Sequence, residues 1–440
     1  METEPSDDSP ATAAGPSPPR WVTLNRYSYR MRSAPAVAGA AATSAASHTS
    51  TSHRFNVSFV LAAPPACSTF YGDWASSDDY VPHRDHEIVA AHGDCLLLDV
   101  TCPGRGPAVC DYFLYEAGAA RPPSLSLLPG CFFPMAFERG KDNVTGRGEE
   151  ARYLWNDNTG VLRSGSAGEV ITVVQLEVPD SVKRKIRDKA ELCVIDTGKL
   201  EWELNREVPI VHGEATAGKA KELMLWWETD VAVPVSDRFL CFVDYFRGFL
   251  VCDMAVDMAA VELRYVPLPV EVSDLNPNFH GRPCTASFQN LAAASTGAVR
   301  FVTVKYRCCR SRGGASDSRC QCGRFLFTVA TWTLSLITAV DNPAAAGWVK
   351  DGVLDCEQLW AMPGYGSIPR RPLTYPVVSC DDDDPDMVCF MVRNGWQYSR
   401  NPEDRKVWML EIDIRSKTLR SVVNVEEQTS DELVAAKLQC

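Results

Sequence analysis

The feature that most constrains the fold is a strand pattern in residues 238–269, which leaves little of that stretch for a helix. Residues 239–246 are rich in aromatic and β-favouring side chains, Arg247-Gly248 interrupts them, and residues 249–253 resume the apolar run. Because glycine accepts a positive φ without steric cost, this pattern predicts a β-hairpin. Apolar residues alternate onto both faces of its strands, so we expect both faces to be covered.

A third strand pattern follows at residues 262–266 and ends at two prolines, which cannot donate to a β-ladder. When Gly93 is aligned with Gly248, Tyr112 and Tyr265 take similar places on the third strand of two similar meanders. The first of these meanders has strand patterns at 87–91, 95–100 and 109–116. Two meanders of one design predict an internal repeat.

Further strand patterns support the repeat, and helical periodicity is nearly absent. They lie at 54–61, 170–177, 191–196, 200–204, 299–306, 324–332, 387–393, 407–414 and 418–425. Short helices are predicted only at 351–360 and 432–438, the second with Thr429 and Glu432 spaced as a capping box. Repeated small meanders must protect their sheet edges, and radial stacking does this. We therefore predict an all-β, irregular β-propeller-like array of antiparallel three- to four-stranded meanders, with a β-sandwich assembly as the alternative.

The composition divides the chain into a single domain with two flanking segments. Residues 1–20 are acidic and proline-rich, which predicts disorder. We expect residues 21–426 to form one domain, in which the Ala/Ser/Thr-rich stretch 35–52 is a low-complexity loop. Residues 427–440 are expected to be a C-terminal tail or short helix.

Charge and cysteine usage limit the possible partners and compartments. The net charge of -12 disfavours nucleic acid and anionic membrane surfaces, since both need a positive protein surface. The 17 cysteines are odd in number, spread over the chain and often inside apolar runs, which is typical of reduced packing residues. No apolar signal region or spanning stretch is visible, so we expect a cytoplasmic and/or nuclear protein.

Four segments resemble a known family. They are WVTLNR at 21–26, the strand pattern 55–61 with Pro64-Pro65 after it, VDYFRGFLVCD at 243–253, and LRYVPLP at 263–269. The sequence resembles plant proteins that carry the domain of unknown function 1618, a family strongly expanded in grasses. It is similar, more distantly, to the propeller-like regions that follow an F-box in plant ubiquitin-ligase adaptors, although no F-box is visible here. The resemblance implies a fold and an intracellular location, but no catalytic residues.

Two clusters could hold a metal ion by residue type. Thiolates bind zinc, and the densest thiols are Cys308, Cys309, Cys320 and Cys322. Adjacent cysteines point their side chains apart, so we expect packing residues beside a hairpin loop and neither metal nor cofactor. The second cluster has no spacing typical of a metal-binding helix, so we expect solvated histidines. It comprises His83, His86 and His92 with Asp79, Asp85 and Asp94.

Two charge runs have a simple structural interpretation. Residues 381–384 and Asp386 are aspartates without the glycine of a calcium loop, which predicts a solvated turn. The basic cluster could contact an acidic partner or the nuclear import machinery, but such runs usually form a solvated loop. It comprises Lys183, Arg184, Lys185, Arg187 and Lys189.

Paired carboxylates are the one enzymatic hypothesis, because glycosidases use two acids and occur on propeller folds. Asp99, Asp244 and Asp253 lie on or beside apolar strands, where burial could raise a pKa; the alternative is that they bind loop amides. No nucleophile elbow, phosphate-binding loop or dinucleotide fingerprint is present. We therefore expect a non-enzymatic protein-interaction scaffold with an unknown protein partner. The alternatives are a cryptic glycosidase-like hydrolase and a ubiquitin-ligase adaptor without an F-box.

Overall fold

The structure is a computed structural model in which most of the predicted domain can be described. It describes residues 19–28, 43–74, 86–102, 110–118, 121–134, 149–165, 169–179, 188–225, 227–270, 287–294, 297–307, 325–342, 346–381, 383–395, 406–425 and 433–438. Nearly all of the predicted disordered tail, residues 1–18, lies outside these ranges. None of the helices in the described part of the chain has the length and apolar character that crossing a membrane requires.

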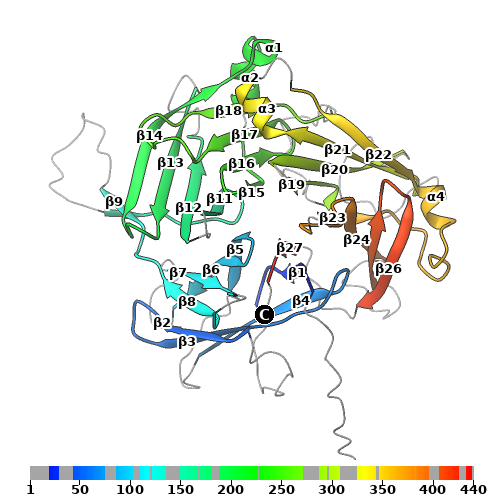
Figure 1. Ribbon diagram of the computed structural model, residues 1–440, viewed down its shortest axis with the longest axis horizontal. Coiled ribbons are helices and arrows are strands. Elements are labelled where there is room, and N and C mark those ends of the chain that lie inside the picture. The colour runs from blue at the N-terminus through cyan, green and yellow to red at the C-terminus, as the bar shows by residue number, and fades with distance from the viewer. Residues whose placement is uncertain are drawn as a thin grey trace, which may run out of the picture.

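The described strands form six blades around a common axis (Figure 1). Blade 1 contains, from the axis outward, β27 (Leu433–Ala436), β1 (Val22–Asn25), β4 (Cys67–Trp74), β3 (Arg54–Val60) and β2 (Ala45–His48). Blade 2 contains β5 (Glu87–His92), β6 (Cys95–Thr101), β7 (Cys110–Glu116) and β8 (Ser124–Leu127). Blade 3 contains β11 (Thr159–Ser164), β12 (Val170–Glu177), β13 (Lys189–Asp196) and β14 (Trp202–Val211).

The other three blades also have four strands each. Blade 4 contains β15 (Val231–Val235), β16 (Phe239–Asp244), β17 (Gly248–Asp253) and β18 (Leu263–Val266). Blade 5 contains β19 (Gln289–Ala294), β20 (Ala298–Tyr306), β21 (Phe327–Ser335) and β22 (Val349–Asp355). Blade 6 contains β23 (Thr374–Val378), β24 (Met387–Arg393), β25 (Val407–Asp413) and β26 (Thr418–Val425).

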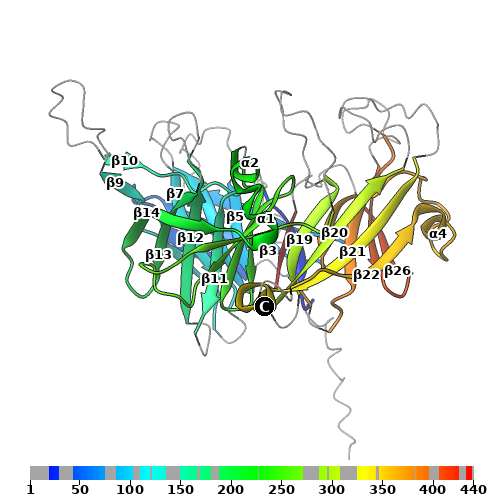
Figure 2. The same ribbon diagram turned by 90° about the horizontal axis from the view of Figure 1, so that it is seen from above.

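The remaining elements lie outside the ring. They are the ribbon of β9 (Phe132–Pro134) and β10 (Glu149–Ala151) and the helices α1 (Glu214–Ala217), α2 (Ala220–Leu225), α3 (Leu336–Asp341) and α4 (Cys356–Trp360). Figures 1 and 2 both place the ribbon and α4 at opposite ends of the molecule. The ring itself carries the site, because every blade contributes its innermost strand to the axis.

The innermost strands contact one another in the order β5, β11, β15, β19, β23, β27 and back to β5. Blades 3 and 4 are also joined at their outer edges, where β14 and β18 pair in parallel over two residues. This closed arrangement confirms the predicted all-β, propeller-like fold and disfavours the β-sandwich alternative.

The ring is closed by the end of the chain, which corrects a prediction. Residues 433–436 form strand β27, not the expected helix, and pair antiparallel with β1 from Val22↔Ala436 to Asn25↔Leu433. The folded domain therefore extends beyond residue 426. The short pattern Leu-Val-Ala-Ala does not favour a strand locally; it becomes one because β1 supplies hydrogen-bond partners.

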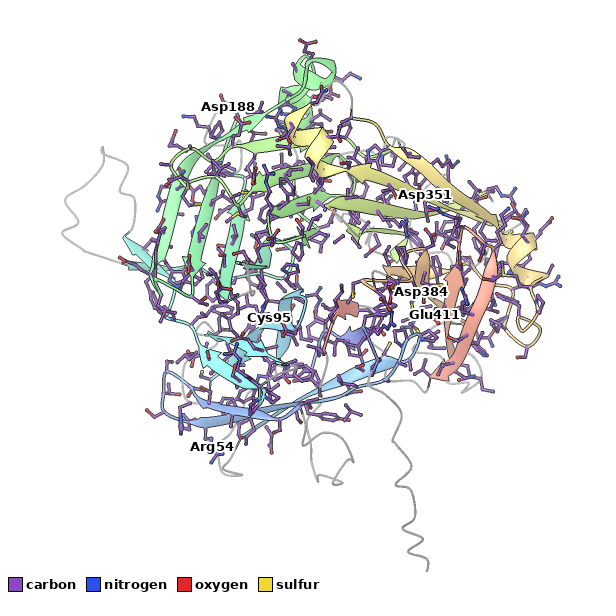
Figure 3. The ribbon with its side chains drawn as sticks, viewed as in Figure 1. Arg54, Cys95, Asp188, Asp351, Asp384 and Glu411 are labelled. Atoms are coloured by element: carbon purple, nitrogen blue, oxygen red, sulfur yellow. The ribbon has the colours of Figure 1, made fainter. Side chains whose placement is uncertain are left out.

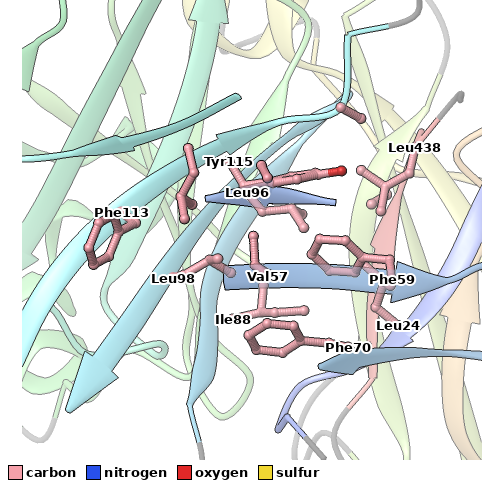
Figure 4. Packing of buried hydrophobic residues seen from close by; sticks show 14 of the residues in the cluster. Leu24, Val57, Phe59, Phe70, Ile88, Leu96, Leu98, Phe113, Tyr115 and Leu438 are labelled. Carbon is pink, nitrogen blue, oxygen red and sulfur yellow. The ribbon is translucent and has the colours of Figure 1, made fainter. Parts of the chain in front are cut away.

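A hydrophobic core between blades 1 and 2 holds both ends of the chain (Figure 4). Leu24 of β1 and Leu438, just after β27, are almost completely buried with side chains from β3 to β7. The others labelled in Figure 4 are Val57, Phe59, Phe70, Ile88, Leu96, Leu98, Phe113 and Tyr115. This core therefore couples the closure of the ring to the packing of two blades.

The predicted repeat is real, but its alignment was wrong by one strand. Gly93 lies between the first and second strands of blade 2, whereas Gly248 begins the third strand of blade 4. Strand β15 was missed because Pro234 interrupts its short apolar run. Position 248 requires glycine because the backbone of Val266 lies close to it. Its φ is +153°, and a Cβ there would lie 2.5 Å from the carbonyl oxygen of Val266.

Two local predictions are corrected in the same way. Residues 45–48 of the predicted low-complexity loop form β2, which pairs with β3 and buries Ala45. The predicted helix at 351–360 begins as strand β22 and becomes α4 only from Cys356, where Asp355 forms a capping box with Gln358.

We predict that removal of residues 433–440 will lower the thermal unfolding midpoint by more than 10 °C, because the ring loses its closing strand and the buried Leu438. Circular dichroism melting measures this directly. A synthetic peptide of residues 427–440 should restore part of the midpoint when added, and a scrambled peptide should not. An unchanged midpoint in the truncated chain would contradict the role assigned to β27.

Candidate functional site

The axis of the ring contains a cavity of about 450 Å³. It is lined mainly by small apolar side chains of the innermost strands, among them Ala90, Ala232, Ala292, Ala293 and Ala435. Its volume is within the range of roughly 300–1,000 Å³ typical of ligand sites. Among the described lining residues there is no Phe, Tyr or Trp, and Asp381 is the single carboxylate. Where the chain is described, the cavity is therefore neither plugged by aromatic rings nor lined by a pair of carboxylates.

The innermost strands begin on one face of the ring, and we call this end of the cavity the amino-end opening. Arg26 and Asn156 line it, and the Asn156 side chain donates a hydrogen bond to Glu87 at the start of β5. The Arg26 guanidinium donates to the carbonyl oxygen of Ile88 at 2.6 Å. These contacts connect blades 1, 2 and 3 at a single point.

Exposed aromatic residues lie beside these polar groups. Trp155, which precedes Asn156, is 57% exposed, and its ring centroid is 5.9 Å from that of Tyr153. Tyr27 is 36% exposed and forms an isolated β-bridge with Glu87. Sequence reasoning missed this group. Its signal was an aromatic residue in the polar stretch WNDNTG directly before a strand, which is where a propeller displays loop residues.

Hydrogen bonds hold the Trp155 loop in place. The backbone N–H of Leu154 donates to the Tyr112 hydroxyl at 2.9 Å, and the Gln175 amide donates to the carbonyl oxygen of Tyr153. Both Leu154 and Tyr112 are buried. The backbone immediately before Trp155 in the chain is thus fixed, while the Trp155 ring stays exposed.

At the other end of the cavity, His92 of β5 is a packed residue and not the solvated histidine expected. Its Nδ1 accepts a hydrogen bond from the backbone N–H of Arg163 at 2.9 Å. Burial lowers the pKa of His92 to about 4, and the positive charges of Arg163 and Lys437 lower it further, against opposing effects of Asp94 and Asp237. His92 is therefore neutral at pH 7.

His86 is also buried, which corrects the expectation of a solvated side chain. Its ring packs 4.9 Å from that of Phe55 and 5.8 Å from that of Trp74. It fits because position 72 is glycine: a Cβ on Gly72 would lie 2.4 Å from the imidazole ring. His83 lies outside the described residues.

The acidic run is the turn between β23 and β24, as predicted, but it is not simply solvated. Asp386 accepts from Arg300 at 2.9 Å and from Arg415 at 3.1 Å. Arg300 is a buried residue of blade 5, and Asp351 of the same blade accepts from Thr333 at 2.6 Å. These ion pairs connect blades 5 and 6, so Asp386 has a structural role.

Asp384 of the same turn lies near Glu411 of β25 (Figure 3). Burial raises the pKa of Glu411, and the negative charge of Asp384 raises it further. The Ser421 hydroxyl, which donates to Glu411 at 3.0 Å, and Arg420 act in the opposite direction.

The three strand aspartates are not brought together as a catalytic pair. Asp244 is completely buried and accepts from the backbone N–H groups of Glu228 and Phe246. Asp253 pairs with Arg238. In the ladder of β16 and β17, Asp253 lies opposite Phe239, which is five residues before Asp244 on β16. The two carboxylates are therefore roughly 17 Å apart. That exceeds the separation of about 10 Å that a glycosidase can use.

Asp99 lies on β6 of blade 2, between its cross-strand neighbours Glu87 on β5 and Tyr112 on β7. None of the three aspartates lines the axial cavity. Asp244 fits the alternative expectation, in which a strand aspartate accepts hydrogen bonds from the backbone amides of loops.

The candidate metal ligands are not placed. Cys308, Cys309, Cys320 and Cys322 lie outside the described residues, as do the basic residues 183–187. Within the described ranges, no three His, Cys, Asp or Glu side chains are arranged to hold a metal ion. Most of the described cysteines are buried packing residues; Cys131 and Cys193 have their sulfur atoms 3.5 Å apart.

Comparison with known proteins supports the family resemblance over part of the chain. Residues 242–389, from blade 4 to blade 6, match the family described as "Protein of unknown function (DUF1618)". A search of curated proteins finds no match.

Solved structures are similar only at a low level. A mutant of the apocarotenoid oxygenase of Synechocystis aligns with a TM-score of 0.31 and 9% identity, covering 92% of this chain and 79% of that one. Sqt1 of Chaetomium thermophilum, bound to the N-terminus of a ribosomal protein, aligns with a TM-score of 0.31 and 9% identity over 87% of this chain and 88% of its own. At this level neither structure bears on the function of this chain.

We predict that His92 makes the protein less stable in acid. Its folded pKa of about 4 is below the unfolded value of about 6.5, so the folded state binds the proton more weakly and stability falls as the pH drops from 6.5 to 4. Between pH 7 and pH 4.5, the free energy of unfolding measured in urea should fall by about 2 kcal/mol less for His92→Asn than for the natural protein. The exposed His48→Asn should behave like the natural protein, and an identical pH dependence in all three would refute the prediction.

We also predict that Glu411→Gln will stabilise the protein at pH 7. The folded pKa of Glu411 is raised by burial and by Asp384, so its ionised form destabilises the folded state, and an amide removes that charge. The gain should disappear as the pH falls below the unfolded pKa of about 4.3. Thermal melts across this range measure the effect, with the exposed Glu201→Gln as control. A destabilised Glu411→Gln at pH 7 would show that the carboxylate is needed.

Proposed function

We propose that this protein is a non-enzymatic interaction scaffold that holds a segment of a protein partner over the amino-end opening of the cavity. The single observation that carries the proposal is Trp155, a large aromatic side chain left 57% exposed on an anchored loop whose next residue, Asn156, lines an apolar cavity. Trp and Tyr dominate binding energy at protein interfaces, because they bury a large area at low entropic cost.

The surroundings of Trp155 support a binding role. Tyr27 and Tyr153 add aromatic surface, and Asn156 and Glu87 supply hydrogen-bonding groups that can orient a peptide. An apolar centre with a few polar groups at its edge is the usual composition of a recognition site. The loop is also held by buried partners, so little ordering entropy is lost on binding.

The enzymatic alternative has less support. A glycosidase needs two carboxylates within about 10 Å beside the substrate. Asp244 and Asp253 are too far apart, and Asp99, which lies opposite Glu87, does not line the cavity. No observation on the described residues favours the ubiquitin-ligase adaptor over a general scaffold.

The test is a displayed library of linear peptides selected on the full chain. We predict that Trp155→Ala will weaken the selected peptides by at least about 30-fold, the effect of losing a hot spot of about 2 kcal/mol. Phe132→Ala, which removes another exposed aromatic residue on β9, should have no effect. Equal thermal unfolding midpoints for the natural protein and both variants would exclude unfolding as the cause of a weaker affinity. Failure to select any peptide, or affinities insensitive to Trp155→Ala, would refute the proposal.

A further inference from the structure

We propose that Cys131 and Cys193 are an oxidation site, at which a peroxide forms a disulfide bond between blade 3 and the segment that leads into β9. Cys131 directly precedes β9, and Cys193 belongs to β13 of blade 3. Their sulfur atoms are 3.5 Å apart and are not bonded to each other. A disulfide bond is about 2.05 Å long, so the two atoms must approach by about 1.5 Å. The inference goes beyond the proposed function and does not depend on it.

Contacts on both sides of Cys131 hold its segment against blade 3. Two residues earlier, the carbonyl oxygen of Pro129 accepts a hydrogen bond from the Trp202 indole of β14 at 2.9 Å. The carbonyl oxygen of Cys131 itself accepts from the backbone N–H of Arg152 at 2.9 Å. The Arg152 guanidinium in turn forms an ion pair with Glu191 of β13. Because these contacts already position the two thiols, little freedom is lost when they react with each other.

Cys131 is the thiol that a peroxide reaches first. It is 4% exposed and lies between the exposed residues Gly130 and Phe132, whereas Cys193 is completely buried. The hydrogen bond between the two side chains raises the pKa of Cys193, and burial raises it further, so Cys193 keeps its proton. Oxidation by a peroxide therefore begins at Cys131, and Cys193 is the resolving thiol.

The reaction has two steps and needs only hydrogen peroxide as the oxidant. In the first step the Cys131 sulfur attacks one peroxide oxygen, the O–O bond breaks, and a sulfenic acid and one water molecule form. In the second step the Cys193 sulfur attacks the Cys131 sulfur, the S–S bond forms and the S–O bond breaks. The hydroxide that leaves takes the proton of the Cys193 thiol and becomes a second water molecule. Two thiols thus lose two electrons and two protons, which reduce the peroxide to water.

The disulfide bond would change the stability of the protein. It joins residues 62 positions apart, which restricts the unfolded chain and so favours the folded state. It also adds a covalent link beside the ion pair of Arg152 and Glu191, both of which are already part of the contact between the segment and blade 3.

The test oxidises the full chain with an excess of hydrogen peroxide, blocks the remaining thiols with N-ethylmaleimide and digests the protein without a reductant. We expect mass spectrometry to find Cys131 linked to Cys193 as the main disulfide product, and dithiothreitol to release it. The thermal unfolding midpoint of the oxidised protein should be at least about 3 °C above that of the reduced protein.

Cys193→Ser should remove both the linked peptide and the rise in midpoint. The matched control is Cys241→Ser, which replaces an equally buried cysteine of β16 and should leave both unchanged. Recovery of both thiols without modification, or of Cys131 as a sulfenic or sulfonic acid with no link to Cys193, would overturn the proposal. So would a rise in midpoint of equal size in Cys193→Ser. The linked peptide of the natural protein decides the matter even where a variant does not fold.

Discussion

The rest of the structure depends on the pairing of β27 with β1. Five blades are formed by strands that follow one another in sequence, but blade 1 needs both ends of the chain. Bringing residues 24 and 438 together closes a loop of over 400 residues, which costs about 5 kcal/mol of chain entropy. Burial of Leu24 and Leu438 in the core between blades 1 and 2 offsets this cost. The closure also positions Arg26, which follows β1, at the opening of the axial cavity.

The cavity follows from the same geometry. Each innermost strand pairs with its own blade on one side only, so its other edge and many small side chains face the axis. Because alanine and valine do not fill this space, the centre stays open. Contacts between blades hold the loop that leads to the opening: the Tyr112 hydroxyl of blade 2 accepts a hydrogen bond from Leu154, which precedes the exposed Trp155. A ring with an apolar centre and displayed aromatic residues is suited to binding.

Charged residues show how far context changes the role of a side chain. The aspartates of the β23–β24 turn suggest solvation when considered as a run, yet Asp386 joins two blades through Arg300 and Arg415. His86 and His92 were expected in solvent, yet one packs on aromatic rings and the other accepts a backbone hydrogen bond. In each case the partners are at least 12 residues away in sequence, so neither spacing nor composition could indicate them.

The sequence by itself determined the fold class and most strands of blades 2 to 6, because alternating apolar residues and glycine or proline turns act over fewer than ten residues. The strands that it missed include the innermost strands β11, β15, β19, β23 and β27, together with β2, β4, β8 and β22. Only the tertiary structure decided that residues 433–436 close the ring and that Arg26 and Asn156, the chain neighbours of Tyr27 and Trp155, line one opening. The physical reason is that pairing and burial of these segments depend on residues of other blades that are distant in sequence. A local sequence pattern does not indicate which residues those are.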